Sequence, residues 1–323
     1  MKRIGVLTSG GDAPGMNAAL RAVVRTGVYH GLEVFGIERG YKGMIDGAIR
    51  PLGPRDVSGI IGRGGTMLFT ARCQEFRERA GRELAAAQLA KLRIDGVVVI
   101  GGDGSYRGAE KLSKEFGIRC VGLPGTIDND IGGTDFTIGF DTAINTAMDA
   151  VDRIRDTAAS HDRIFFVEVM GRSSGYVAMI SGIAGGAENI IVPESLTDID
   201  TLVQRLREGQ ARGKRSSIIV VAEGDEVGRA SSIAAKVAER SEFKDNRVTV
   251  IGHLQRGGSP TAFDRVLASR MGVRAVEALL EGESGKMVSV SGQNMLLRPL
   301  AEAWELRTRF DPGLLRVAHV LSV

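Results

Sequence analysis

Two carboxylates and a hydroxyl group lie within five residues of one another in the segment 124–130, which reads PGTIDND. If this segment is extended, Thr126, Asp128 and Asp130 project in one direction, because alternate residues of an extended chain share a face. Close carboxylates repel and raise each other's pKa, so such a group is rarely gathered for stability alone. The pattern indicates a base for a hydroxyl proton, beside groups that contact phosphoryl oxygens.

Two glycine-rich loops are candidates for binding a phosphate chain. Residues 8–17 read TSGGDAPGMN between an expected strand and an expected helix, and residues 101–105 read GGDGS after an apolar run. Backbone N–H groups at such turns attract anions. Asp103 would suit Mg²⁺, which is usually held by one or two carboxylates and by phosphate oxygens. The alternatives are a tight strand-to-helix turn for the first loop and a helix N-cap role for Asp103.

Cationic side chains stand beside further glycines, in the segments 170–175 (MGRSSG) and 253–260 (HLQRGGSP). Guanidinium groups match the geometry of phosphate oxygens, so both segments are candidates for holding a phosphate. Taken singly, His253 reads as a structural histidine, and Arg72, Arg163 and Arg247 read as solvated surface residues. Neither nucleotide-binding pattern, GxxxxGK[ST] or GxGxxG, describes the first loop.

Short β-branched runs alternate with helical periods along the whole chain, which predicts an α/β fold with mainly parallel sheets. We expect two Rossmann-like lobes with an active-site cleft between them. The glycine-rich loops follow the carboxyl ends of expected strands, where open α/β sheets bind ligands. The expected strands are 3–8, 32–37, 96–100, 119–123, 163–169, 189–192, 217–222 and 248–252. The clearest expected helices are 16–29, 83–91, 105–115, 141–158, 199–208 and 264–281.

The composition is that of an ordinary globular protein, with 43% hydrophobic and 25% charged residues among 323. No apolar run approaches the roughly 20 residues that span a bilayer, and the first residues do not look like a secretory signal, so we expect a cytoplasmic protein. A net charge of +3 and dispersed basic residues do not indicate nucleic-acid or membrane binding. Two cysteines without CxxC spacing suggest neither disulfides nor a zinc site.

In their order and spacing, GGDAPGMN, GGDGS, PGTIDND, MGRSSG and HLQRGGSP resemble the bacterial ATP-dependent 6-phosphofructokinases. The resemblance is weakest in 38–55, in 226–246 and in roughly the last thirty residues. It implies allosterically regulated phosphorylation of fructose 6-phosphate to fructose 1,6-bisphosphate by ATP, a glycolytic step, in a homotetramer whose active sites are shared between subunits. We expect an ATP-binding lobe at 1–137, with part of the C-terminal segment as an optional addition, a fructose 6-phosphate-binding lobe at 138–300 and an unassigned segment at 301–323.

The resemblance also implies site residues. Asp128 would be the base, and Thr126, Arg172 and Arg72 would complete the catalytic set. Mg²⁺ would lie on Asp103, and the ATP contacts would be Gly11, Arg72, Cys73, Gly102, Asp103, Gly104 and Ser105. Fructose 6-phosphate would be held by Thr126, Ile127, Asp128, Met170, Gly171, Arg172, Glu223, His253, Leu254, Gln255 and Arg256. Arg163 and Arg247 would reach it from a neighbouring subunit.

A regulatory anion site is the last implication. Arg21 and Arg25 are four residues apart and share one helix face. By resemblance they belong to a site where ADP activates and phosphoenolpyruvate inhibits, with Glu188 on the Mg²⁺ of ADP. The other residues implied are Ala22, Val23, Val24, Arg55, Gly59, Arg155, Gly186, Ala187, Arg212, Lys214, Arg215 and Ser216. Pro54 stands where some members have an arginine, and Arg55 follows it.

Two other functions remain open at the level of the sequence. A pyrophosphate-dependent relative typically carries an aspartate at the position of Gly104 and a lysine at that of Gly125, so the glycines favour ATP. A sensor of nucleotides and sugar phosphates without turnover would be expected to lose the base, and this chain retains Asp128.

Overall fold

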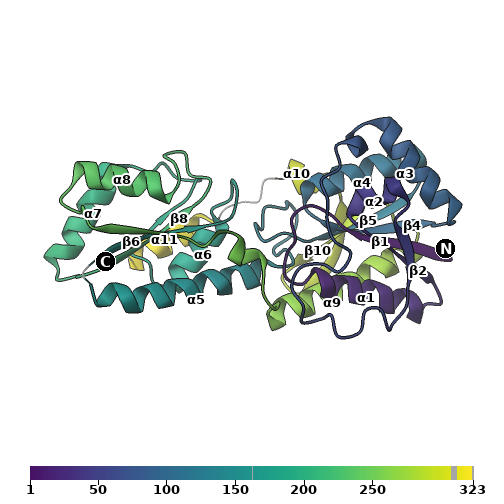
Figure 1. Ribbon diagram of the computed structural model, residues 1–323, viewed down its shortest axis with the longest axis horizontal. Coiled ribbons are helices and arrows are strands. Elements are labelled where there is room, and N and C mark those ends of the chain that lie inside the picture. Colours follow the sequence, from purple (N-terminus) through teal and green to yellow (C-terminus); the bar gives the residue numbers. More distant parts are fainter. Residues whose placement is uncertain (162, 307–310, 322–323) are drawn as a thin grey trace. The chain divides into compact units, whose positions relative to one another are not determined.

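The chain forms two compact units, each built around its own β-sheet (Figure 1). The computed structural model describes residues 1–161, 163–306 and 311–321. Within these residues the first unit comprises 1–142 and 256–306, and the second comprises 143–255 and 311–321. The units therefore differ from the expected division, because residues 256–300 belong to the first unit and not to the second.

The sheet of the first unit has the strand order β11-β10-β5-β4-β1-β2-β3. Neighbours from β10 to β2 are parallel, and β11 and β3 are antiparallel edge strands. The central strand β4 is buried along its whole length, as expected for a strand covered on both faces. The strands are β1 Arg3–Thr8, β2 Glu33–Ile37, β3 Ile49–Leu52, β4 Gly96–Gly101, β5 Arg119–Pro124, β10 Lys286–Ser291 and β11 Asn294–Pro299.

Helices cover both faces of this sheet, with α1 and α9 on one and α2, α3 and α4 on the other (Figure 1). A Cβ atom at Gly272 would lie 2.6 Å from the Cβ of Ala22, so glycine permits the close contact of α9 with α1. This packing places residues 262–280 in the first unit. The helices are α1 Met16–Tyr29, α2 Gly40–Asp46, α3 Arg79–Lys91, α4 Asp103–Phe116, α9 Ala262–Leu280, α10 Glu302–Glu305 and the 3-10 turn η1 Glu75–Arg77.

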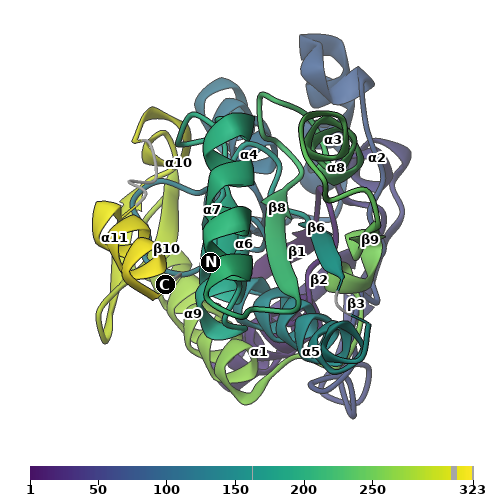
Figure 2. The same ribbon diagram turned by 90° about the vertical axis from the view of Figure 1, so that its left-hand side faces the viewer.

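The sheet of the second unit has the order β7-β8-β6-β9, and all its strand pairs are parallel (Figure 2). Helices α7 and α8 bury an apolar face against it, and α11 packs against α6 and β7. The elements are α5 Phe140–Ala159, β6 Ile164–Val169, α6 Tyr176–Ala184, β7 Asn189–Ile191, α7 Ile199–Ala211, β8 Ser217–Ala222, α8 Ala230–Arg240, β9 Asn246–Val250, η2 Gly252–Arg256 and α11 Pro312–Leu321.

The expected α/β fold with mainly parallel sheets is confirmed. The structure also contains elements that the sequence pattern did not predict, among them β3, β10, β11, α2, α6, α8 and α11. The strand β9 begins and ends two residues before the expected strand 248–252. Among the described residues, no helix combines the length and the apolar character that crossing a membrane requires.

Candidate active site and anion sites

The two expected phosphate loops are neighbours at the carboxyl ends of β1 and β4. The backbone N–H of Ser9 donates to the carbonyl of Ile100 at 2.9 Å. A Cβ atom at Gly101 would lie 2.5 Å from the carbonyl oxygen of Ser9, so this contact requires glycine. Gly10 has a φ of +88° and turns the first loop toward α1. The loops therefore form one surface rich in backbone groups.

Asp103 is the first residue of α4, and its N-cap is Gly102, so the alternative of an N-cap role for Asp103 is wrong. Its side chain is 43% exposed, and the closest cation, Arg107, is 3.9 Å away. The N-terminus of a helix favours such a negative charge. Cβ atoms added at Gly102 or Gly104 would meet nothing within 4 Å, so the space beside this carboxylate is open.

Behind the second loop lies an aromatic pair that the sequence analysis did not identify. The phenol of Tyr41 donates to the carbonyl of Ser105 at 2.5 Å, and its ring stacks on Phe76 with centroids 4.0 Å apart. Burial raises the pKa of Tyr41 well above its ordinary value, which keeps the phenol protonated as a donor. Cys73 packs against the same cluster, and Arg72 is exposed beside it. Tyr41 lies in residues 38–55, one of the regions where the family resemblance is weakest, so no sequence motif indicated its position.

The loop after β5 is largely buried. Asp128 is 1% exposed, and its Oδ2 accepts a hydrogen bond from the Thr126 hydroxyl at 3.4 Å. The hydroxyl of Thr137 donates to the carbonyl of Thr126 at 2.7 Å. The N–H of Gly125 donates to the carbonyl of Gly101 at 3.1 Å, which joins this loop to the one after β4. The Asp128 carboxylate is therefore held in a fixed, largely desolvated position.

The segment is not extended as far as Asp130. Residues 127 and 128 form a bend, and Asn129 has a φ of 49°, in the left-handed region. The amide of Asn129 donates to the carbonyl of Asp135 at 3.1 Å and its oxygen accepts from the N–H of Thr137 at 2.9 Å, which stabilises this conformation. The expectation of a shared direction for alternate side chains therefore fails at Asn129.

Arg256 extends along the first glycine loop in the same unit. Its Nη1 donates to the carbonyl of Asp12 at 3.2 Å. A Cβ atom at Gly11 would lie 2.5 Å from that nitrogen, so a side chain at Gly11 would displace the guanidinium. Two residues that the sequence resemblance assigns to different substrates thus lie in contact.

In the second unit, the predicted sugar-phosphate residues meet at the carboxyl ends of β6 and β8. The carboxylate of Glu223 accepts from the N–H groups of Gly171 and Arg172 at 3.3 and 2.9 Å. The side chain of Gln255 is fully buried and accepts from the N–H of Met170 at 2.8 Å. Glu223 and Gln255 thus fix the loop backbone, while Arg172 is exposed and Leu254 is largely exposed.

Arg163 and Arg247 lie at the opposite edge of that sheet. Arg163 precedes β6 and Arg247 is the second residue of β9, whereas the loop at 170–172 follows β6. Both arginines contact Asp245, and the hydrogen bond from Arg163 lowers the pKa of this carboxylate most. A strand of six residues is about 20 Å long, so these arginines and Arg172 cannot hold one phosphate of the same chain.

The predicted regulatory residues are divided between the two units. In the first unit, Arg25 is exposed and Arg21 is partly buried on α1, but Ala22, Val23 and Val24 are buried, so their side chains face the core. Arg55 is exposed, and Gly59 has open space around it.

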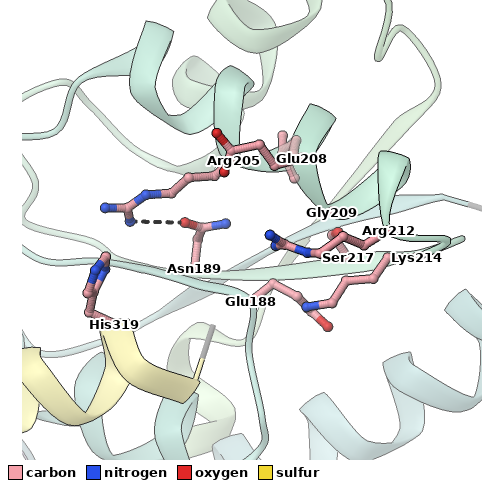
Figure 3. Close-up of a pocket in the computed structure, with 10 residues that line it drawn as sticks. Glu188, Asn189, Arg205, Glu208, Gly209, Arg212, Lys214, Ser217 and His319 are labelled. Atoms are coloured by element: carbon pink, nitrogen blue, oxygen red, sulfur yellow. Dashed lines mark hydrogen bonds between the residues drawn. The ribbon is translucent and has the colours of Figure 1, made fainter. Parts of the chain in front are cut away.

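In the second unit, Arg155 donates to the carbonyls of Gly185 and Gly186 at 2.7 and 2.6 Å. Its guanidinium lies 3.5 Å from Glu188, which also accepts from the N–H of Ile218 at 2.6 Å. Glu188 lines a pocket together with Arg212 and Lys214 (Figure 3). Gly186 has a φ of +65°, while Ala187, Arg215 and Ser216 do not line this pocket.

Comparison with known proteins supports the family resemblance that the loop motifs indicate. Residues 3–279 match the family model described as phosphofructokinase. The chain is 58% identical over 323 residues to ATP-dependent 6-phosphofructokinase 1 of Thermus thermophilus, and 54% identical over 323 residues to ATP-dependent 6-phosphofructokinase of Bacillus subtilis. Both alignments cover 100% of each chain.

Solved structures extend the comparison to the fold. Phosphofructokinase from Saccharomyces cerevisiae superposes with a TM-score of 0.91 at 38% identity, over 100% of this chain and 48% of that one. A pyrophosphate-dependent phosphofructokinase from Marinobacter aquaeolei superposes with a TM-score of 0.85 at 23% identity, over 100% of this chain and 92% of that one, which shows the fold alone. The matched family model and the full-length relatives show that the chain belongs to the phosphofructokinase family.

Proposed function

We propose that the chain transfers the γ-phosphate of ATP to the 1-hydroxyl of fructose 6-phosphate. The observation that carries this proposal is the buried carboxylate of Asp128, held by Thr126 in a loop that is hydrogen-bonded to the glycine-rich loop after β4. Phosphoryl transfer depends mainly on positioning and electrostatics, and a fixed carboxylate supplies the base that accepts the hydroxyl proton. The full-length relatives named as ATP-dependent 6-phosphofructokinases support the same reaction.

In this mechanism each loop of the first unit has one task. Asp128 accepts the proton of the attacking hydroxyl, while Thr126 and Arg72 contact oxygens of the transferred group. Backbone groups at Gly11 and at residues 102–105 bind the phosphate chain of ATP, because their N–H groups lie at turns and at the start of α4.

The residues at the start of α4 fit a magnesium ion. Asp103 is a single, half-exposed carboxylate beside open space, and Mg²⁺ is typically held by one or two carboxylates and by phosphate oxygens. When bound there, the ion would neutralise charge on the phosphate chain.

The donor is ATP rather than pyrophosphate on two local observations. Open space at Gly104 leaves room for the nucleotide, where pyrophosphate-dependent relatives typically carry an aspartate. A Cβ atom at Gly125 would lie 3.0 Å from Met16 and 3.1 Å from Ile100, so the lysine typical of those relatives would not fit without a shift. The open space at Gly104 and the close packing around Gly125 therefore favour ATP, the larger donor.

Residues of the second unit bind the sugar phosphate in this proposal. Arg172 and His253 supply cationic or donor side chains, and Met170 and Gly171 supply backbone that Glu223 and Gln255 hold in place. Leu254 is the remaining contact from this unit, and Ile127 and Arg256 are the contacts proposed from the first unit.

Arg163 and Arg247 complete the active site of a neighbouring subunit. Their place at the amino-terminal edge of β6 and β9, away from the loop at 170–172 of the same chain, supports this assignment. It requires an oligomer, and we propose the homotetramer that the family resemblance implies. Mixing an Asp128→Asn variant with an Arg163→Ala variant should then restore part of the activity.

We also propose that ADP and phosphoenolpyruvate regulate the enzyme. Glu188, Arg212 and Lys214 line a partly polar pocket in the second unit, and Arg155 lies 3.5 Å from Glu188, which supports a phosphate-binding role. Arg21, Arg25 and Arg55 of the first unit are assigned to the same effectors.

A coupled assay tests the proposed reaction. Fructose 6-phosphate is supplied with ATP and Mg²⁺ in one series and with pyrophosphate and Mg²⁺ in another. We expect turnover with ATP and none above background with pyrophosphate. Turnover with pyrophosphate but not with ATP would show that pyrophosphate is the phosphate donor. The absence of turnover with both donors would support a sensor without catalytic activity.

A further inference from the structure

The pocket of the second unit extends beyond the residues that the family resemblance assigns to effectors. Its volume is about 120 Å³, and its lining comes from the start of β7, from α7, from the loop before β8 and from α11 (Figure 3). Asn189, Arg205, Ser217 and His319 line it together with Arg212 and Lys214. The C-terminal helix α11, to which no role was assigned, thus contributes a wall through His319.

The floor of this pocket is polar and buried. Asn189 and Ser217 are 8% and 9% exposed, and both line the pocket. The side-chain oxygen of Asn189 accepts from Arg205 at 3.4 Å, but within the described residues neither its amide nitrogen nor the Ser217 hydroxyl has a hydrogen-bond partner. Because both residues line the pocket, these two groups can donate hydrogen bonds to a bound ligand.

The pocket lining carries more cationic than anionic side chains, with Arg205, Arg212 and Lys214 against Glu188 and Glu208. Among the described residues, Arg205, Arg212 and Lys214 have no carboxylate within ion-pair distance. Of the two carboxylates in the lining, Glu188 contacts Arg155 and the N–H of Ile218, and Glu208 accepts from Gln204 at 3.0 Å. Cations gathered over a buried polar floor attract an anion.

We infer that Arg205, Asn189 and Ser217 form an inner anion subsite, which binds the second anionic group of a small organophosphate whose phosphate lies at Arg212 and Lys214. This inference rests on the proposal that the loop with Arg212 and Lys214 binds a regulatory phosphate. Arg205 is thereby a residue that determines which effector binds, because it selects ligands with two anionic groups over inorganic phosphate. Its guanidinium can hold a carboxylate or phosphate through two hydrogen bonds.

The chain offers a matched control on the same helix. Arg207 is two residues from Arg205, is exposed, pairs with Glu242 at 2.8 Å and does not line the pocket. Arg205→Gln and Arg207→Gln change the net charge equally, so a difference between them reports the position of the guanidinium rather than the overall charge.

Calorimetric titration of the full chain with phosphoenolpyruvate and, separately, with inorganic phosphate tests the subsite. We expect Arg205→Gln to weaken phosphoenolpyruvate binding at least about tenfold, as for a lost charge-assisted hydrogen bond, and phosphate binding less than about threefold. Ser217→Ala should weaken phosphoenolpyruvate in the same sense by a smaller factor, and Arg207→Gln should leave both affinities unchanged.

Several results would overturn the inference. Unchanged phosphoenolpyruvate binding in Arg205→Gln would remove the subsite, and so would equal losses in Arg205→Gln and Arg207→Gln. Loss of binding in Lys214→Ala with normal binding in Arg205→Gln would remove it while retaining the regulatory phosphate. A parent that binds neither probe would remove both. Turnover with saturating fructose 6-phosphate and ATP, measured in parallel, tests the proposed reaction independently.

Discussion

The loops of the first unit and the pocket of the second unit both suit anions, but they present different chemical groups to the anion. In the first unit, Thr126 and Asp128 are buried, and backbone hydrogen bonds join successive loops at the carboxyl edge of the sheet. In the second unit, the charges are carried by long, exposed side chains such as Arg205 and Arg212 above a small buried floor.

This difference is expected from the two tasks that we propose, catalysis in the first unit and regulation in the second. Proton transfer from a hydroxyl requires a base within hydrogen-bond reach of a fixed substrate atom, which a braced and buried carboxylate provides. Regulation requires only that a ligand bind one state better than another, which exposed cations can provide through small movements. Variants in the first unit should therefore affect the chemical step, and variants in the pocket should affect effector response.

Asp128→Asn is expected to have the largest effect. The substitution keeps the shape of the side chain but removes the base, so kcat should fall by about 10²- to 10⁴-fold, while KM for fructose 6-phosphate changes little. Steady-state kinetics and a thermal unfolding curve of the same preparation check this. A near-normal kcat in a folded variant would mean that the buried carboxylate is structural. The proposed catalytic role of the loops in the first unit would then be unsupported.

Lys214→Ala should have an intermediate effect, restricted to regulation. Loss of one charge-assisted contact corresponds to roughly tenfold weaker phosphoenolpyruvate inhibition, with kcat at saturating fructose 6-phosphate nearly unchanged. Saturation curves with and without phosphoenolpyruvate measure it, and Lys91→Ala, at an exposed lysine of α3, is the control. A large fall in kcat with unchanged inhibition would show that the pocket serves the chemical step.

The two cysteines allow the interior of the first unit to be compared with the edge of its proposed ATP-binding loops. Cys120 is buried, and burial raises the pKa of its thiol to about 12, so it should not react with iodoacetamide in the folded protein. Cys73 is half-buried at a proposed ATP contact and should react, several-fold more slowly when ATP is present. Mass spectrometry of alkylated peptides measures both rates. Equal rates for Cys73 with and without ATP would contradict the ATP contact.

The smallest expected effect concerns stability at the surface of the second unit. The hydrogen bond from Arg207 lowers the pKa of Glu242 from 4.5 to about 2. A lowered pKa in the folded state stabilises the protein above pH 4.5, and this contribution is lost as the pH falls toward 2. Arg207→Gln should therefore lower Tm slightly at pH 7, and the difference from the parent should shrink below pH 4.5. A difference independent of pH would exclude the ion pair as its cause.

The sequence predicted those elements whose local hydrophobic pattern matches their burial in the folded protein. The buried runs of β4 and β5 and the periodic helix α1 are of this kind, and each is followed or preceded by a glycine-rich loop. The edge strand β11 was not predicted, because its exposed positions break the apolar pattern. The strand β10 was not predicted, because its pairing with β5 depends on tertiary packing that includes α9.

The candidate site shows the same division. Asp128 was identified from a short motif, since its partner Thr126 is close in sequence, whereas Glu223 was implied by the family resemblance alone. Tyr41 and Arg205 were not identified, because their contacts with Ser105 and Asn189 depend on tertiary packing. The bend at Asn129 was also missed, since its stabilising bonds come from residues 135 and 137.

The most direct test of the central claim follows the phosphoryl group itself. Parent protein and Asp128→Asn are each incubated with ATP, Mg²⁺ and fructose 6-phosphate, and ³¹P NMR records the loss of the γ-phosphate signal and the appearance of product. The account predicts stoichiometric conversion to ADP and fructose 1,6-bisphosphate by the parent, and conversion at least about a hundredfold slower by the variant. ATP consumption without a sugar bisphosphate, or equal rates in both proteins, would contradict it.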